Sequence, residues 1–409
     1  MEDEMKKKKI RKQLKRIARK QKRVLDDIYG LIGKLDGGAP IEIDAIIPVG
    51  LMKALLGTTN EKEEADDGPQ IYGVKWDYSD PKNRPVRIGK CTGWPKPSPA
   101  GDIDEEGTSP FDDVMPWAGM KRYAVDGGVI TGIPAGARDE NHQGDIMVYI
   151  PSFWYRARKD ESEKTWTWEV SPEEQEGFTL HPGSGKYISR YHTSDNDKNL
   201  TSCPGSWPLT NTSQTEFRER SRDKGSGWEM LGIETWSAVQ LLYLIEFADF
   251  DSYRMLGSGY TDEEEWKTGR MGQTDGALYH TICRSGKSNM YRWIEDPFAN
   301  CLDWIDGFEG SRKETYVRGV RTGISLPTPE IITGFGYSDA CPWAFIPDSS
   351  GAEYHEGACA FVNSNSSLCP AFVGGLYSDY AYCGFFYFNA FSSASSSYGS
   401  LGSRLLYKP

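Results

Sequence analysis

Few residues in this 409-residue sequence have the types and spacing that chemistry requires. The eight cysteines contain no CxxC pair, so neither a zinc knuckle nor a small disulfide framework is indicated, and we expect them to be mostly reduced and buried. The five histidines are His142, His181, His192, His280 and His355. They form neither an HxxxH nor an HExxH pattern, and no Ser, His and Asp set follows from spacing. We therefore predict no catalytic residue, no metal site and no cofactor.

Two acidic segments come closest to a functional site. Asp303 and Asp306 lie among aromatic residues and could form an acid and base pair, but carboxylates in such a turn-rich segment more often bind backbone amides. Residues 195–199, "DNDKN", resemble the start of a calcium loop. Leu200 and Ser206, however, stand where an EF-hand requires Gly and Glu. We expect structural carboxylates in the first segment and a loop with Asx turns in the second.

The tail of the chain has a composition suited to recognition. Ten aromatic residues fall between Phe372 and Tyr398, interleaved with Ser, Ala and Gly. Charged residues make up 26% of the chain, yet the 46 residues from Gly357 to Gly402 contain only one, Asp379. Tyr and Phe offer contact area at low rotamer cost, and Ser, Gly and Asn adapt their hydrogen bonds, as in antibody loops. So many aromatics require either burial within the fold or use in binding.

The elements that must position these residues begin with a helix. Apolar residues, with Gln21 among them, recur at steps of four and three from Ile10 to Leu35, which is the seam of a coiled coil. In the heptad repeat abcdefg of a coiled coil, β-branched residues at the core position d favour bundles of three or four helices. We therefore predict a parallel homotrimer that is held together by a coiled coil over residues 1–37. Twelve Lys or Arg in residues 6–23 leave two alternatives open. These are nucleic-acid binding by the basic faces and a single amphipathic helix docked on its own domain.

The rest of the chain divides by composition. Residues 38–69 read as a connector, and from residue 70 onward Trp, Tyr, Gly and Pro are frequent while turn signals recur. We expect a β-rich intermediate region over 70–145 and a further β-rich domain over 146–409. With the N-terminal helix, this makes the predicted fold class α+β.

Two elements of the larger domain can be placed. Alternating apolar residues predict a hairpin with strands Met147–Ala157 and Thr165–Ser171. The stretch Thr235–Phe250 is apolar on nearly every face, which predicts a helix buried against a sheet.

Membrane insertion and secretion are not indicated by the sequence. No run of about 18 apolar residues could span a bilayer. The N-terminus is too charged for a signal peptide and has no apolar stretch before a cleavage site. We expect a soluble globular protein that is made in the cytoplasm.

Several motifs, taken in order, resemble a known family. They are "MVYIPSFWY", "FTLHPGSG", "GWEMLGIETWSAVQLLYLIEF", "IEDPFANCLDWIDG" and the terminal "GSRLLY", preceded by "IYGVKWDYSDP" and "SPFDDVMPWAGMKRY". Together they resemble the formylglycine-generating-enzyme type of C-type lectin fold, and more narrowly its use in phage tail receptor-binding proteins. The resemblance implies a C-type lectin-like ligand-binding domain over 146–409 with an exposed C-terminal face. The closely placed cysteine pair of the family's enzymes cannot be found here, so we expect no enzyme.

The resemblance also suggests an origin for the tail's composition. Some proteins of this type are variable proteins of diversity-generating retroelements, in which template adenines are randomised. An AAC or AAT codon so treated cannot yield Lys, Glu, Gln, Met or Trp, and residues 357–402 contain none of these. We expect a variable segment over 354–400. A Ser- and aromatic-rich β surface of fixed sequence would show the same bias and stays an alternative.

We expect thirteen tail residues to lie largely on one exposed ligand-binding surface. They are Tyr377, Ser378, Asp379, Tyr380, Tyr382, Phe386, Tyr387, Phe388, Asn389, Phe391, Ser393, Ser395 and Tyr398. Their neighbours should be scaffold, with glycines in tight turns and "SRLLY" as a final strand paired back into the sheet. These scaffold residues are Gly374, Gly375, Gly384, Gly402, Ser403, Arg404 and Leu405.

The functional hypothesis is an adhesin in a phage or prophage tail. It would bind a host cell-surface protein or glycan, contact other tail or virion proteins through its N-terminal region, and reside in the virion as a homotrimer. It would bind no nucleic acid and insert into no membrane. Two alternatives stay open: a structural virion component without a receptor role, and an enzyme of the formylglycine-generating type.

Overall fold

The structure is a computed structural model, and it describes residues 68–409 apart from a few internal segments. Those segments are 81, 101–106, 197–198, 260–281, 286–287, 352–357 and 364–366. The predicted coiled coil at 1–37 and the connector up to residue 67 lie outside the described residues, as do His280 and His355.

The expected α+β class is wrong for the part of the chain that the structure describes. β-sheets dominate it, and it contains only three α-helices. These are α3 (Gln214–Asp223), α4 (Ile233–Phe247) and α5 (Ser252–Leu256). The strongest helical pattern in the sequence lies before residue 38, outside the described residues. The remaining chain is rich in turn residues and aromatics, which favour short strands.

A five-stranded sheet carries the predicted hairpin. Its order is β2-β1-β7-β6-β8. Its strands are β1 (Tyr72–Asp77), β2 (Val86–Gly89), β6 (Trp154–Asp160), β7 (Thr165–Ser171) and β8 (Thr179–Leu180). The hairpin pairing of β6 with β7 and the predicted second strand, Thr165–Ser171, are confirmed. The predicted strand Met147–Ala157 is instead two strands, because Pro151 lacks the N–H that a continuous ladder needs.

The first of these two strands belongs to a six-stranded sheet. Its order is β12-β26-β9-β5-β3-β4. The strands are β3 (Arg122–Asp126), β4 (Val129–Gly132), β5 (Asp145–Ile150), β9 (Lys186–Ser189), β12 (Trp228–Met230) and β26 (Leu405–Tyr407). β26 pairs antiparallel with both β12 and β9, which confirms the predicted return of the final strand into a sheet.

A seven-stranded sheet contains most of the tail. Its order is β21-β20-β22-β24-β23-β16-β25. The strands are β16 (Leu302–Trp304), β20 (Glu330–Phe335), β21 (Pro347–Gly351), β22 (Cys359–Val362), β23 (Phe372–Gly374), β24 (Gly384–Ala390) and β25 (Leu401–Gly402). β24 is an inner strand, parallel to β22 and antiparallel to β23.

Smaller elements complete the described part. Three small sheets are formed by β10 (Ser194–Asn196) with β11 (Asn199–Thr201), by β13 (Ile282–Ser285), β14 (Ser288–Tyr291) and β15 (Ile294–Glu295), and by β17 (Phe308–Gly310), β18 (Thr315–Val317) and β19 (Val320–Arg321). Short 3-10 helices are η1 (Trp117–Gly119), η2 (Asp139–Asn141) and η5 (Tyr380–Tyr382).

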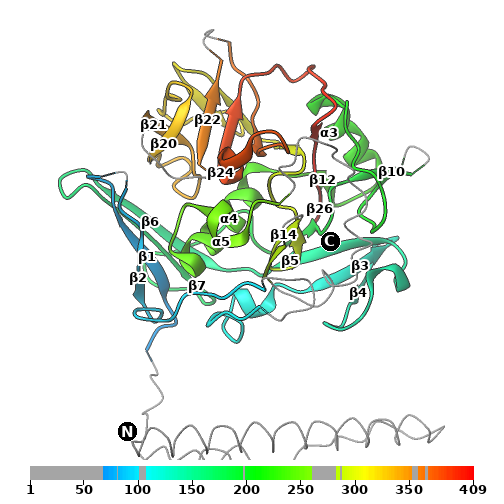
Figure 1. Cartoon of the computed structure of the whole chain (residues 1–409), viewed down its shortest axis with the longest axis horizontal. Helices are drawn as coiled ribbons and strands as arrows, with labels where there is room; N and C mark the ends of the chain where they lie inside the picture. The colour runs from blue at the N-terminus through cyan, green and yellow to red at the C-terminus, as the bar shows by residue number, and fades with distance from the viewer. Residues whose placement is uncertain are drawn as a thin grey trace, which may run out of the picture. The chain divides into compact units, whose positions relative to one another are not determined.

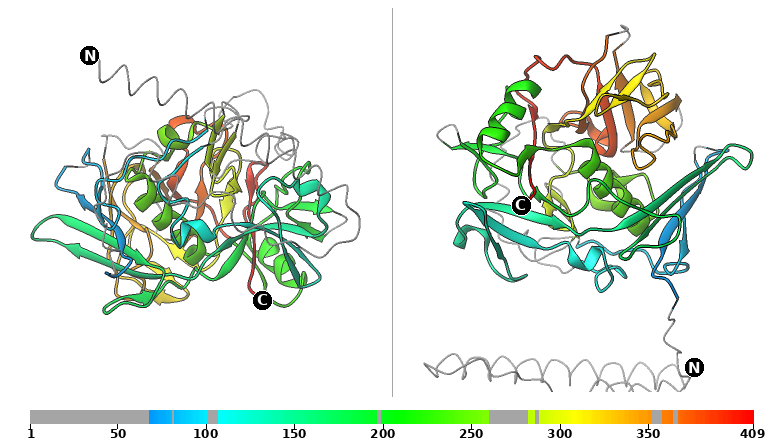
Figure 2. Two further views of the ribbon diagram at one scale, coloured as in Figure 1. Left: turned by 90° about the horizontal axis from the view of Figure 1, so that it is seen from below. Right: turned by 180° about the vertical axis from the view of Figure 1, so that it is seen from behind.

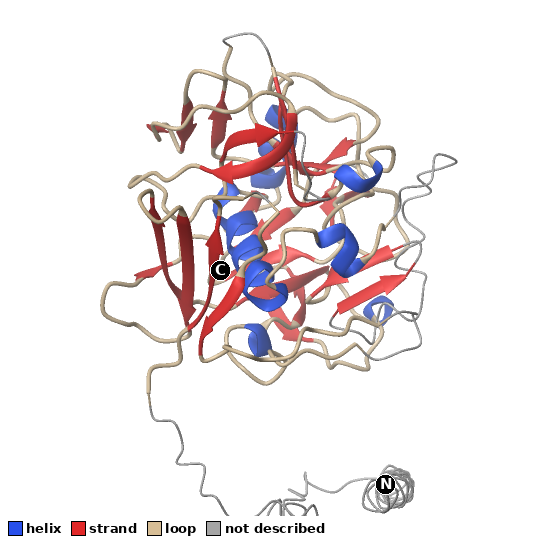
Figure 3. Ribbon diagram, turned by 60° about the vertical axis from the view of Figure 1, so that its left-hand side comes forward, coloured by secondary structure: helices blue, strands red, loops and turns tan. Residues whose placement is uncertain are grey.

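Helix α4 is the centre of the core. All its residues are buried, as the sequence predicts, and it lies between the five- and six-stranded sheets on one side and the seven-stranded sheet on the other (Figures 1 and 2). Figure 3 shows strands surrounding it. The Tyr243 ring lies 4.9 Å from that of Phe247 and 4.8 Å from that of Phe385 in β24. No described helix is long and apolar enough to cross a membrane.

Candidate functional site

Strand β24 belongs to the core. Phe386, Tyr387, Phe388 and Asn389 are buried, so the exposure predicted for these four residues is wrong. The strand has hydrogen-bonded neighbours on both edges, and aromatic residues cover its faces: the Phe388 ring, for example, lies 5.0 Å from that of Phe308. The sequence contained the signal, because an apolar run without polar alternation indicates a strand buried on both faces.

Several residues on either side of β24 are at the surface, although Cys383 and Ser392 are buried. Tyr382, Phe391 and Tyr398 expose 48%, 55% and 51% of their surface. Ser378, Ser393 and Ser395 are exposed as well, Tyr377 is half-buried, and η5 contains Tyr380, whose side chain is not described. We call Tyr377, Ser378, Tyr382, Phe391, Ser393, Ser395 and Tyr398 the tail surface.

Strand β22 connects the two halves of the tail surface. The ring of Phe361 in β22 lies 6.5 Å from that of Tyr382. Two residues further on, Asn363 donates its Nδ2 hydrogen to the Phe391 carbonyl at 3.0 Å. Tyr382 precedes β24 and Phe391 follows it, so these contacts along β22 bring both ends of the strand into one neighbourhood.

Asp379, the single charge of residues 357–402, closes a turn. Its Oδ2 accepts from the Leu376 N–H at 3.0 Å, and its own N–H donates to the Leu376 carbonyl at 2.9 Å. Burial raises the pKa of this carboxyl. Gly375 precedes the turn with φ +82°, and a Cβ there would approach the Cys383 Sγ to 2.8 Å, which supports its predicted scaffold role. Asp379 is half-buried and structural, and the tail surface therefore has no charged side chain.

The serine-rich segment after Phe391 is held by its main chain. The Tyr398 carbonyl accepts from the Asn211 N–H at 2.9 Å, and the Ser400 carbonyl accepts from the Leu302 N–H at 2.9 Å. These acceptors are backbone oxygens that any residue provides. The exposed side chains take no part in these two hydrogen bonds, although Ser393 Oγ lies 3.0 Å from Ser395 Oγ and 3.1 Å from Ser396 Oγ within the segment.

The acidic residues singled out in the sequence form ion pairs beneath the tail. Asp303 Oδ2 lies 2.9 Å from Arg404 Nε, and its Oδ1 lies 3.1 Å from His192 Nδ1. Burial alone would raise the Asp303 pKa, but His192 and Arg404 outweigh it and lower the pKa. Asp306 lies 2.8 Å from both Arg218 and Arg318. Within the described part of the chain, both carboxylates bind side chains rather than the backbone amides considered for them.

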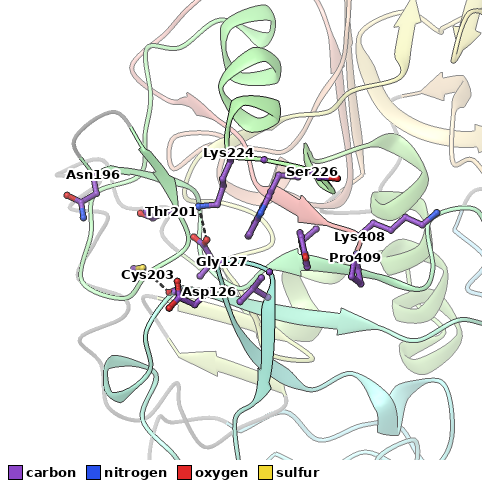
Figure 4. A pocket seen from close by; sticks show the side chains of 16 residues that line it. Asp126, Gly127, Asn196, Thr201, Cys203, Lys224, Ser226, Lys408 and Pro409 are labelled. Atoms are coloured by element: carbon purple, nitrogen blue, oxygen red, sulfur yellow. Dashed lines mark hydrogen bonds and ion pairs between the residues drawn. The ribbon is translucent and has the colours of Figure 1, made fainter.

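A pocket of about 780 Å³ is the other candidate site, and sequence reasoning missed it (Figure 4). Lys224, Trp228 and Tyr407 line it, together with the turn between β3 and β4. These residues come from distant parts of the chain, and no motif connects them. Asp195, from the suspected calcium loop, instead pairs with Arg220 at 2.7 Å.

No protein-family model and no curated protein matches the sequence. The solved structures with detectable similarity include the P3c variant of Major Tropism Determinant, at 12% identity and a TM-score of 0.28, covering 83% of this chain and 72% of that one. The M1 variant has 12% identity and a TM-score of 0.27, covering 70% and 72%. PvdO from Pseudomonas aeruginosa has 12% identity and a TM-score of 0.23, covering 67% and 97%. Values this low establish neither a common fold nor a common activity.

Proposed function

We propose that this chain is the receptor-binding protein of a phage or prophage tail and that the tail surface binds a host-surface protein or glycan. The observation that carries the proposal is the exposure of Tyr382, Phe391 and Tyr398 by about half each. They are accompanied by serine hydroxyls and by no charged side chain. Rigid aromatic anchors among adaptable hydroxyls are the composition of antibody binding loops.

The main-chain anchoring of the segment supports a diversified surface. The carbonyl groups of Phe391 and Tyr398 hold the segment, whereas their side chains are exposed. Replacing such side chains leaves the anchoring hydrogen bonds in place. The lack of Lys, Glu, Gln, Met and Trp in residues 357–402 agrees with adenine-directed diversification.

The proposal extends to assembly and location. The protein would act as a homotrimer in the virion and attach to other tail proteins through its N-terminal region. It would have no catalytic activity.

The test compares exposed aromatics inside and outside the tail surface. Labelled full-length protein carrying Tyr382→Ala, Phe391→Ala or Tyr398→Ala is titrated onto cells of the strain that carries the gene and of related strains. At least one substitution should cost about 2 kcal/mol or more of binding, as hot-spot aromatics do. Tyr337→Ala is the matched control, because Tyr337 is 41% exposed and lies outside the tail.

Thermal unfolding of each variant separates binding from folding. The tail-surface variants should melt within a few degrees of the wild type, since exposed substitutions change stability by about 0.5 kcal/mol or less. Cell binding that survives all three substitutions would favour the structural virion component instead. Equal loss in the Tyr337→Ala variant would show that the assay reports something other than the tail surface.

A further inference from the structure

The pocket in Figure 4 lies at the meeting point of several turns. Asp126 at the end of β3 and the turn residues Gly127 and Gly128 form one rim, and Gly225 and Ser226, just after α3, form another. Gly127 and Gly128 adopt φ of +54° and +87°, a left-handed turn that glycine adopts without strain. The pocket and the tail surface have no residue in common.

A buried ion pair organises the pocket wall. Lys224 Nζ lies 2.7 Å from Asp145 Oδ2 and donates to the Leu200 carbonyl at 2.6 Å. The Asp145 Oδ1 accepts from the Ser202 N–H at 2.7 Å. These contacts fix both charged groups before any ligand arrives.

Two aromatic rings form the apolar part of the wall. The ammonium of Lys224 lies 4.6 Å from the centre of the Trp228 ring, and the ring of Tyr407 lies 4.7 Å from that of Trp228. Trp228 is in β12 and Tyr407 is in β26, which pair with each other directly. The sheet itself therefore holds the two rings together.

The lining carries side-chain charges of both signs. Asp126 and Asp145 oppose Lys224 and Lys408, and Lys224 already pairs with Asp145. The described residues contain no group of three or more His, Cys, Asp or Glu that could hold a metal ion. A ligand that forms hydrogen bonds and has no net charge suits such a lining.

We propose that this pocket binds a neutral, hydroxyl-rich ring, such as one monosaccharide unit of a glycan. Its volume falls within the range of small-molecule sites, about 300–1,000 Å³. Asn196, Thr201 and Ser226 line the pocket with groups that both donate and accept hydrogen bonds, as sugar hydroxyls do. Trp228 and Tyr407 also line the pocket but are only 8% and 5% exposed, so they add a small apolar contact area to a mainly polar lining. This site goes beyond the proposed function, because it needs no contact with the tail surface.

The experiment uses saturation-transfer NMR of the full-length protein with glucose, galactose, mannose and N-acetylglucosamine, each tested singly. At least one sugar should receive magnetisation from the wild-type protein. Ser226→Trp fills the pocket from an exposed position and should abolish that signal. Asp126→Ala removes a rim acceptor and should weaken affinity about tenfold, the usual effect of losing a hydrogen bond to a charged group.

Ser162→Trp, at an exposed serine in the β6–β7 turn, is the matched control and should keep the signal. Thermal unfolding confirms that each variant is folded. The proposal is overturned if no neutral sugar gives transfer, or if transfer persists in folded Ser226→Trp. A signal lost only in Tyr398→Ala would also overturn it, and would assign sugar binding to the tail surface instead.

Discussion

Strand β24 and the segment 391–398 follow one another along the chain, yet the aromatic residues of the first are core and those of the second are surface. Every residue of β24 is buried, whereas Phe391, the next residue, is 55% exposed. The two stretches differ in their hydrogen-bonded neighbours. β24 pairs with a strand on each side, whereas the segment after it is held mainly by hydrogen bonds that its own carbonyl groups accept. Whether an aromatic residue of this tail is buried therefore depends on its place relative to the sheet and not on its residue type alone.

The largest expected effect tests the core side of this comparison. Phe385→Ala should lower the free energy of unfolding by about 3–5 kcal/mol, because it leaves a cavity against Trp236 and Tyr243. Phe391→Ala, the matched surface change, should cost about 0.5 kcal/mol or less. Urea unfolding measures both. Equal losses of unfolding free energy in the two variants would contradict the assignment of β24 to the core and of Phe391 to the surface.

The buried ion pair beneath the tail should have a similar effect. Arg404→Met leaves the Asp303 carboxylate buried without its cation, and breaking such a pair costs about 3–5 kcal/mol. Urea unfolding of Arg404→Met and of the double variant Asp303→Asn/Arg404→Met provides the comparison. The double variant should recover part of the loss, and a double variant as unstable as the single one would contradict the role assigned to Asp303.

The core should also respond to pH through Glu295. Complete burial raises the pKa of this carboxyl to about 7 from an ordinary 4.5, although Arg190 lies 3.6 Å away. The native state keeps a proton that the unfolded state releases, so this group's contribution to stability falls as pH rises from 4.5 to 7. Glu295→Gln removes that dependence. Its melting temperature relative to the wild type should therefore rise across this window, and a constant difference would contradict the raised pKa.

A smaller loss is expected at the turn before β24. Asp379→Ala removes the acceptor of the Leu376 N–H and should cost about 1–3 kcal/mol. Because the turn positions Tyr382, cell binding should weaken along with stability. Ser378→Ala, at the exposed neighbour, is the control for stability and should leave thermal melting unchanged. Unchanged thermal melting of Asp379→Ala would make Asp379 a surface residue after all.

The smallest effect belongs to the surface side. Ser395→Asn and Tyr398→Ser should each change unfolding free energy by about 0.5 kcal/mol or less, because the segment is held by carbonyl groups rather than by these side chains. Differential scanning calorimetry checks this. Losses above about 2 kcal/mol would place these side chains in the core.

Secondary-structure elements that depend on a local residue pattern could be predicted from the sequence. Features that depend on contacts between distant residues could not. Strand β7, helix α4 and the final strand β26 follow from local patterns, and the structure has all three. The α+β class was wrong because it depended on a helical pattern outside the described residues. The exposure predicted for residues of β24 was wrong for a similar reason, because the sequence does not show that β22 and β23 flank this strand.

The polar contacts were the least predictable feature. Asp303 meets Arg404 and His192, from segments about a hundred residues away in either direction, so no spacing rule could pair them. The pocket is similar, since Asp145, Lys224 and Tyr407 come together only through the six-stranded sheet. A local pattern indicates an element, whereas the partners of a charge depend on the whole topology.

The position of β26 has a consequence for how the protein is made. This strand fills the place between β12 and β9, so the six-stranded sheet stays open while residues 186–404 are being synthesised. Pairing between such distant segments is slow, and unpaired edges invite aggregation in the meantime. The sheet is thus completed only after residues 405–407 have been made, and ribosome-bound chains stalled before Leu405 should engage chaperones far more than chains in which β26 has left the ribosome.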